Sequence, residues 1–192
     1  MKILINLFLL TSLVTNAYTL SFITDIKAKE YNDVWGQWFD KDVTVYAGSD
    51  GDSSTIRFVF EMNLGEYNHD YRFSGTNVNQ SSDFMEFYNH LKKAQEWSKI
   101  AKDNNAETNR DIGGCSTWST ICKVSFESTN GGRSTSAMLY IKEDDEWSFN
   151  EGNFKINSNV LDQLLLKISP ARLNKTLAES KNKNNQADDL FN

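Results

Sequence analysis

The chain has 192 residues and a formal net charge of −6, a length that suits one domain with a sizeable core. The negative charge argues against nucleic acid or an anionic membrane surface as a partner, because both repel an acidic protein. Aromatic residues make up 12% of the chain, so we expect rings to fill much of the core.

The first seventeen residues have the pattern of a secretory signal peptide. One positive residue, Lys2, precedes an apolar run from Ile3 to Val14, and the segment ends in Ala17 with the small residue that a signal peptidase requires. The apolar run is shorter than the roughly 20 residues that a membrane-spanning helix needs. We therefore expect cleavage before Tyr18, a secreted or periplasmic mature protein, and no stable membrane span after cleavage.

Residues 18–179 are expected to form a single globular domain. The segment Leu20–Asp40 has a mixed pattern around Gly36, which predicts a short helix or an irregular segment. Alternation of apolar and polar residues predicts strands at Val43–Tyr46 and Thr55–Asn63, with a third at Tyr67–Ser74.

The segment Ser82–Asn105 has the pattern of a long, well-capped amphipathic helix. Ser82 or Asp83 can cap its first turn, and the polar run from Asp103 ends it. At helical spacing one face collects mainly apolar residues, namely Phe84, Phe87, Tyr88, Leu91, Ala94, Ser98 and Ala101. This face needs a large apolar partner, which the strands on either side can provide.

The strand pattern returns after this helix. Thr120–Ser128 and Thr135–Lys142 alternate on either side of Asn130-Gly131-Gly132, which is typical of a β-hairpin. A further hairpin is predicted for Glu146–Asn150 and Asn153–Ile156 around Glu151-Gly152, followed by helices over Val160–Ile168 and from Pro170 onward. The polar residues 180–192 are predicted to form a disordered tail.

The order of these elements predicts an α+β fold. Most consecutive strands are joined by short turns, which favours antiparallel pairing. We therefore expect an antiparallel β-sheet of about five to seven strands, with one long central amphipathic helix and C-terminal helices on one face.

Catalytic and metal-binding patterns are scarce. The two histidines, His69 and His90, lack metal-ligand spacing, and the chain has neither a nucleophile elbow nor a phosphate-binding glycine motif. Cys115 and Cys122 are the only cysteines, and in an exported chain they predict a structural disulfide rather than a catalytic thiol. We expect no catalytic residue, no metal and no cofactor. A small exported hydrolase with a site made of histidine and carboxylates is the alternative.

Two acidic segments carry side chains that could ligate calcium. Asp50-Gly51-Asp52-Ser53-Ser54 offers oxygen ligands at alternate positions but has Thr55 where a calcium loop has its central glycine. Glu143-Asp144-Asp145-Glu146 is expected to be an exposed turn. Solvated turns are the prediction for both segments.

Four tryptophans form the candidate binding surface: Trp35, Trp38, Trp97 and Trp118. Trp97 lies off the main apolar stripe of the helix, and Trp118 stands among serines and threonines between the two cysteines. Exposed aromatic rings beside hydroxyl groups suit a protein or a glycan partner, whereas the alternative is that these rings pack in satellite clusters under loops. The sequence thus favours a non-catalytic binding module, with a carbohydrate-binding protein as one alternative, and it leaves the oligomeric state open.

Overall fold

The computed structural model describes residues 19–50, 53–61, 68–75, 78, 82–144 and 151–191. The predicted signal peptide, the predicted strand Glu146–Asn150 and parts of both acidic turns lie outside these residues. The strands are β1 (Thr19–Asn32), β2 (Gln37–Asp50), β3 (Ser53–Glu61), β4 (Asn68–Gly75), β5 (Thr108–Gly114), β6 (Thr120–Thr129), β7 (Ser134–Glu143) and β8 (Glu151–Asn157). The helices are α1 (Asp83–Asn104), α2 (Ser158–Lys167) and α3 (Pro170–Phe191).

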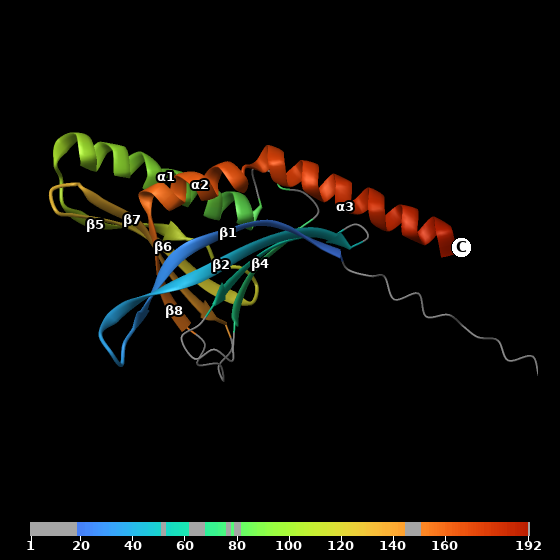
Figure 1. Cartoon of the computed structure of the whole chain (residues 1–192), viewed down its shortest axis with the longest axis horizontal. Helices are drawn as coiled ribbons and strands as arrows, with labels where there is room; N and C mark the ends of the chain where they lie inside the picture. Colours follow the sequence, from blue (N-terminus) through green and yellow to red (C-terminus); the bar gives the residue numbers. More distant parts are fainter. Residues whose placement is uncertain are drawn as a thin grey trace, which may run out of the picture.

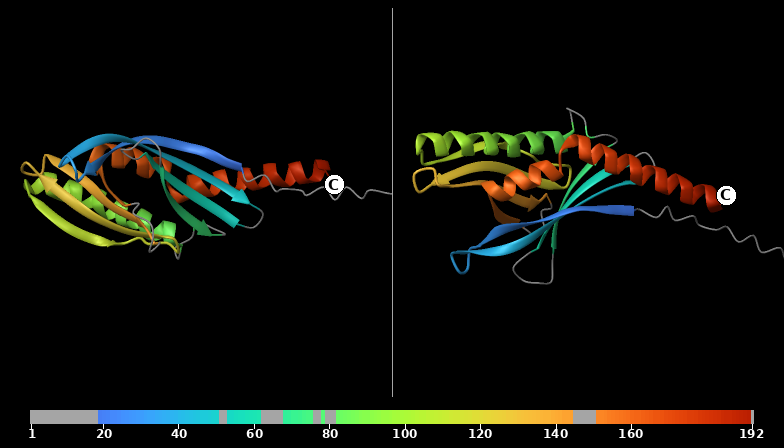
Figure 2. Two further views of the ribbon diagram at one scale, coloured as in Figure 1. Left: turned by 90° about the horizontal axis from the view of Figure 1, so that it is seen from below. Right: turned by 45° about the horizontal axis from the view of Figure 1, so that its top comes forward.

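All eight described strands belong to one antiparallel sheet with the order β4-β3-β2-β1-β8-β7-β6-β5. Each half of the sheet is a meander of four consecutive strands, and the halves meet where β1 pairs with β8 at Lys29 and Glu30. Figure 1 shows the three helices along one side of this strongly twisted sheet, with the turn between β1 and β2 projecting away from them at the lower left. Figure 2 shows α1 beside the strands of the second meander and α3 extending past the sheet.

Aromatic rings fill the core between α1 and the first meander, as the composition predicts. Phe87 on α1 lies with its ring centroid 5.4 Å from that of Phe58 on β3 and 5.1 Å from that of Phe73 on β4. The Ser82 side chain caps the helix by accepting from the Met85 backbone N–H. The predicted helix face is buried, except that Tyr88 is only partly covered. Local capping and one apolar stripe thus place α1 on the sheet.

The α+β class and the antiparallel pairing are confirmed, but two details of the predicted architecture are wrong. Over the described residues the sheet has eight strands rather than five to seven, because the segment Leu20–Asp40 forms most of β1 and the start of β2 rather than a short helix. No single helix is central, since α1 and α3 have 22 residues each. The α1 helix contacts mainly the second meander, and α3 packs on β2 and β1.

The predicted turn at Glu151-Gly152 is also wrong, because these residues begin β8 and pair with β7. Gly152 is needed there for packing rather than for a turn. A Cβ atom at this position would lie 2.6 Å from the ring of Phe154, whose side chain is fully buried. The glycine therefore gives Phe154 room to enter the core.

The α3 helix runs to Phe191, through residues 180–191, which the composition predicted to be disordered. The first half of α3 buries Leu173, Leu177 and Ser180, and the Ser49 N–H on β2 donates to the Ser180 hydroxyl at 3.3 Å. Neither glycine nor proline follows Pro170, so the packed half can extend as a helix into the polar segment. None of the described helices combines the length and the apolar character that crossing a membrane requires.

Candidate functional site

The structure joins Cys115 and Cys122 in the predicted disulfide, with their Cα atoms 4.8 Å apart. The disulfide crosses the end of the β5–β6 hairpin. The Cys115 N–H donates to the Cys122 carbonyl at 2.9 Å, and the Thr117 N–H donates to the Thr120 carbonyl at 2.8 Å. Both cysteines are buried, so the bridge lies inside the molecule while the turn at Trp118 lies outside. Residues 115–122 are called the Trp118 hairpin below.

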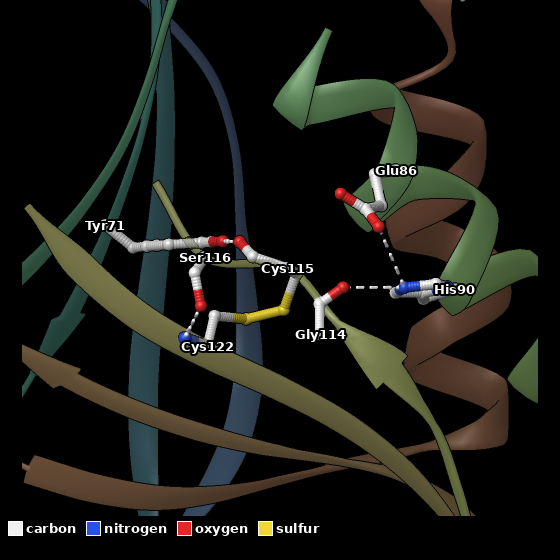
Figure 3. Close-up of a disulfide and its surroundings, with 7 residues drawn as sticks. All are labelled: Tyr71, Glu86, His90, Gly114, Cys115, Ser116 and Cys122. Atoms are coloured by element: carbon white, nitrogen blue, oxygen red, sulfur yellow. Dashed lines mark hydrogen bonds and ion pairs between the residues drawn. A yellow bond between two sulfur atoms is a disulfide. The ribbon is translucent and has the colours of Figure 1, made fainter. Parts of the chain in front are cut away.

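Two side chains from other elements hold the base of the Trp118 hairpin (Figure 3). The Tyr71 hydroxyl on β4 donates to the Cys115 carbonyl. His90 on α1 places its Nε2 atom 2.7 Å from the Gly114 carbonyl, and because a carbonyl only accepts, this nitrogen carries the proton. Since β4 and β5 are opposite edges of the sheet, the Tyr71 contact connects the two edges.

The Tyr71 hydroxyl is held in its donor form. Burial raises the pKa of this phenol, and the nearby carboxylates of Asp83 and Glu86 raise it further. A phenol with a raised pKa stays protonated at neutral pH. The hydroxyl therefore keeps the proton that it donates to the Cys115 carbonyl.

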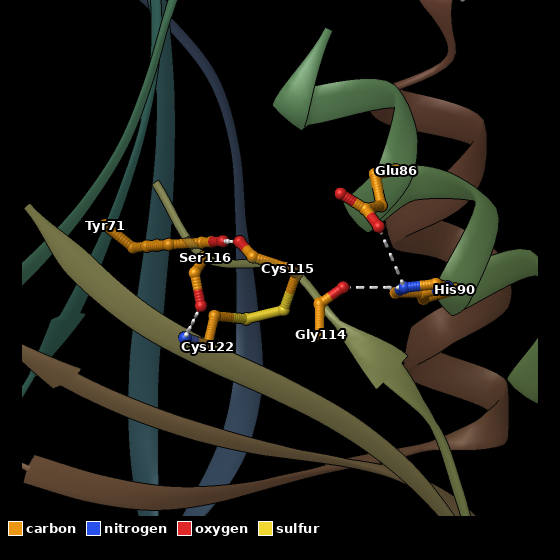
Figure 4. A network of polar contacts seen from close by, with 7 residues as sticks. All are labelled: Tyr71, Glu86, His90, Gly114, Cys115, Ser116 and Cys122. Carbon is orange, nitrogen blue, oxygen red and sulfur yellow. Dashed lines mark hydrogen bonds and ion pairs between the residues drawn. A yellow bond between two sulfur atoms is a disulfide. The ribbon is translucent and has the colours of Figure 1, made fainter. Parts of the chain in front are cut away.

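The hydrogen bonds from Tyr71 and His90 to the base of the Trp118 hairpin are called the clamp below. The His90 ring is engaged in this clamp. Its Nε2 atom also lies 3.9 Å from Glu86 Oε1, one turn earlier on α1 (Figure 4). A Cβ atom at Gly113 would lie 2.5 Å from His90 Nε2, so the ring can reach the Gly114 carbonyl only because residue 113 is glycine. The other histidine, His69, has its backbone in β4 opposite Phe60, and its side chain lies outside the described part of the chain.

Trp118 is 81% exposed at the tip of the clamped hairpin. Both arms next to it are tied to neighbouring backbone. The Ser116 hydroxyl accepts from the Cys122 N–H at 3.1 Å, and the N–H of Asp144, the residue after β7, donates to the Ser119 carbonyl at 2.9 Å. The large apolar side chain of Trp118 is thus exposed to solvent on a hairpin that hydrogen bonds and a disulfide hold in place.

The other three candidate tryptophans lie elsewhere. Trp97 packs against the core, with its ring 5.9 Å from Phe126 and Lys93 Nζ 5.0 Å from its centroid. Trp38 on β2 is half-buried, and Trp35 is 70% exposed in the turn between β1 and β2. The structure therefore leaves two of the four rings, Trp35 and Trp118, largely open to solvent, on different hairpins.

Sequence reasoning missed two residues that shape these surfaces. Val34 is 87% exposed beside Trp35, and the run from Asn32 to Gly36 contains the turn-forming residues that could have indicated a hairpin there. Tyr71 lies in the predicted strand Tyr67–Ser74, and its strand pattern indicates no further role. Its contact with Cys115 spans 44 residues of chain, and nothing local in the sequence indicates it.

Within the described ranges, no group of three or more His, Cys, Asp or Glu side chains is arranged to hold a metal ion. Comparison with protein-family models, with curated proteins and with solved structures finds no match to this chain. Its function has to be inferred from the residues themselves.

Proposed function

We propose that the protein acts by binding a partner, without turnover, and that the Trp118 hairpin is a principal contact. The observation that supports this is the 81% exposed ring of Trp118 on a hairpin with a buried disulfide at its base. Tryptophan is among the residues that most often carry the energy of protein interfaces. A frame that is already ordered lowers the entropy that binding costs. The hydroxyl groups of Ser116 and Ser119, close to Trp118 in the chain, also suit a glycan, so both partner classes enter the test.

The alternative, a small exported hydrolase with a His/carboxylate site, has less support. A catalytic base must offer an accepting nitrogen to its substrate. His90 Nε2 instead donates to the Gly114 carbonyl, and Gly113 lies directly against the ring. Using this nitrogen as a base would break the clamp that holds the Trp118 hairpin.

Replacing Trp118 with alanine is expected to weaken binding of the partner at least about 30-fold, which corresponds to about 2 kcal/mol for an interface anchor. The melting temperature should stay the same, because an exposed ring contributes little to the stability of the folded protein. The measurement is affinity capture with the mature protein from extracts of the producing organism, together with a glycan array. Ile100→Ala is the matched control, since Ile100 is an apolar side chain 57% exposed on α1. The proposal fails if every ligand bound by the wild type is bound equally by Trp118→Ala.

We further propose that the protein is exported, to the periplasm or the medium. The apolar run after Lys2 supports export, and the disulfide is of the kind that persists in oxidising compartments. The mature protein is expected to begin at Tyr18. Intact-mass measurement of the protein recovered outside the cytoplasm checks this, and retention of residues 1–17 would refute it.

A further inference from the structure

A second exposed apolar site lies on a different hairpin, at the turn between β1 and β2. The β3 strand pairs with β2 only from Val43 onward, and β8 pairs with β1 only at Lys29 and Glu30. Beyond these points β1 and β2 pair with each other alone among the described strands. Residues 27–42 are called the β1–β2 ribbon below. Its part from residue 31 to residue 42 extends past the rest of the described sheet and away from the helices (Figure 1).

The turn of the ribbon is ordered by one side chain. Asn32 Oδ1 accepts from the backbone N–H groups of Val34 at 3.0 Å and Trp35 at 3.1 Å. The Gly36 N–H donates to the Asn32 carbonyl at 2.8 Å, and Gly36 takes the positive φ of 62° that closes the turn. The turn thus presents Val34, 87% exposed, and Trp35, 70% exposed, in a defined geometry.

The stem of the ribbon, residues 27–32 and 37–42, carries equal numbers of positive and negative side chains. The whole ribbon has seven charged residues, three lysines and four acids, and six of them form cross-strand ion pairs: Lys27–Asp42, Lys29–Asp40 at 3.4 Å and Lys41–Glu30 at 4.0 Å. The seventh is Asp33, in the turn itself. A nearly neutral stem in a protein of net charge −6 ends in an apolar tip with one acidic neighbour.

Trp38, which pairs with Tyr31 next to the turn, connects the far end of the ribbon to the sheet. Its ring lies 5.2 Å from that of Tyr31 across the ribbon, and Lys155 Nζ on β8 lies 5.5 Å from its centroid. Lys155 is itself held by an ion pair with Glu127 on β6. These contacts bury part of Trp38 and set the direction in which the tip points.

We propose that the tip of the β1–β2 ribbon is a second docking site, which places Val34 and Trp35 in an apolar pocket of a partner protein with a basic residue at its rim, facing Asp33. This inference rests on the proposed function, because it also assumes that the protein acts by binding a partner, but it concerns a separate surface. A partner that complements the tip must bury its two apolar side chains and offer one positive charge to Asp33, because the charges of the stem are already paired. A lipid surface suits the tip less well. Even a whole myristoyl chain gives only marginal membrane binding. The tip itself offers one valine and one tryptophan, and the next exposed apolar side chain of the ribbon, Phe39, is only 39% exposed.

The test uses the full mature protein to capture, identify and then titrate the partner, in wild-type form and as Trp35→Ala, Trp35→Phe, Asp33→Asn, Trp118→Ala and Ile100→Ala. Trp35→Ala should weaken binding about 30-fold, whereas Trp35→Phe should retain most of it and Ile100→Ala should leave it unchanged. Raising the salt from about 0.1 to about 0.5 M should weaken wild-type binding less than about threefold, since only one exposed charge is engaged. Asp33→Asn should remove this salt dependence. Phosphatidylcholine vesicles serve as a separate probe and should not bind.

The outcomes separate the two proposals. If Trp118→Ala abolishes binding and Trp35→Ala does not, the ribbon proposal is overturned and the proposed function stands. The reverse result supports the ribbon and overturns the contact assigned to the Trp118 hairpin, while retention by both variants overturns both. Vesicle binding that depends on Trp35 would also overturn the choice of a protein partner. Equal melting temperatures for Trp35→Ala and the wild type show that a loss is not caused by unfolding.

Discussion

Replacing Phe87 with alanine is expected to lower the free energy of unfolding by about 3–5 kcal/mol. Phe87 is 1% exposed, and its ring contacts those of Phe58, Phe73 and Tyr71, with centroids 5.4, 5.1 and 5.6 Å away. Removing the ring leaves a cavity between α1 and the first meander. The rings that would line the cavity stand on β3 and β4, which pair with each other in the sheet, so little of the cavity can collapse. Urea denaturation of the purified protein measures the change.

Glu96→Ala is the control for this experiment, because Glu96 is exposed on the same helix. Its effect should lie within about 0.5 kcal/mol. Phe87→Ala should also loosen Tyr71, whose ring it supports, and so increase amide exchange in the Trp118 hairpin. A loss of stability below about 1 kcal/mol would contradict the assignment of Phe87 to the centre of the core.

The parts of the fold that the sequence predicted well are those whose signals are local. The capped helix α1 carries its buried stripe within one segment, and the β6–β7 hairpin has alternating strands around Asn130-Gly131-Gly132. The disulfide followed from the count of cysteines and the predicted export. Each of these inferences needs only neighbours in the chain or a simple rule of pairing.

The sequence did not predict the β1–β2 ribbon as a pair of strands, because its order of apolar and polar residues does not follow which side chains are buried. Past Glu30 the ribbon leaves the described sheet, residues 33–37 are exposed, and the alternation of apolar and polar residues stops. Glu30 itself faces the core side and is 5% exposed, close to Lys41. Charged residues on the inner face therefore made a strand look like an irregular segment.

The candidate surface could be predicted only in part, because exposure depends on tertiary neighbours. Trp97 and Trp118 both looked free of the predicted apolar faces, yet Phe126 covers one of them and solvent surrounds the other. The clamp by Tyr71 depends on two opposite sheet edges meeting, which sequence spacing does not encode. The residue type alone thus indicates the candidate tryptophans, and only the fold shows which of them are exposed.

Removing the disulfide with the double change Cys115→Ala and Cys122→Ala is expected to lower the free energy of unfolding by about 2.5 kcal/mol. The closed loop is short, with a sequence separation of 7, so the chain-entropy gain lies near the low end of the usual range. Alanine is preferred to serine because both positions are buried, and a serine hydroxyl there would add its own desolvation cost. Urea denaturation measures stability, and Lys123→Ala, an exposed change next to Cys122, is the control.

The same double variant should weaken partner binding through Trp118 even where the protein is still folded. The bonds from Tyr71 and His90 hold the Gly114 and Cys115 carbonyls, so one arm of the hairpin stays in place, but the arm after Trp118 loses its covalent tie. Hydrogen exchange should then rise at residues 116–121 and not in α1. Unchanged stability, exchange and binding would show that the hydrogen bonds alone order the hairpin. The rigid display of Trp118 would then not depend on the disulfide.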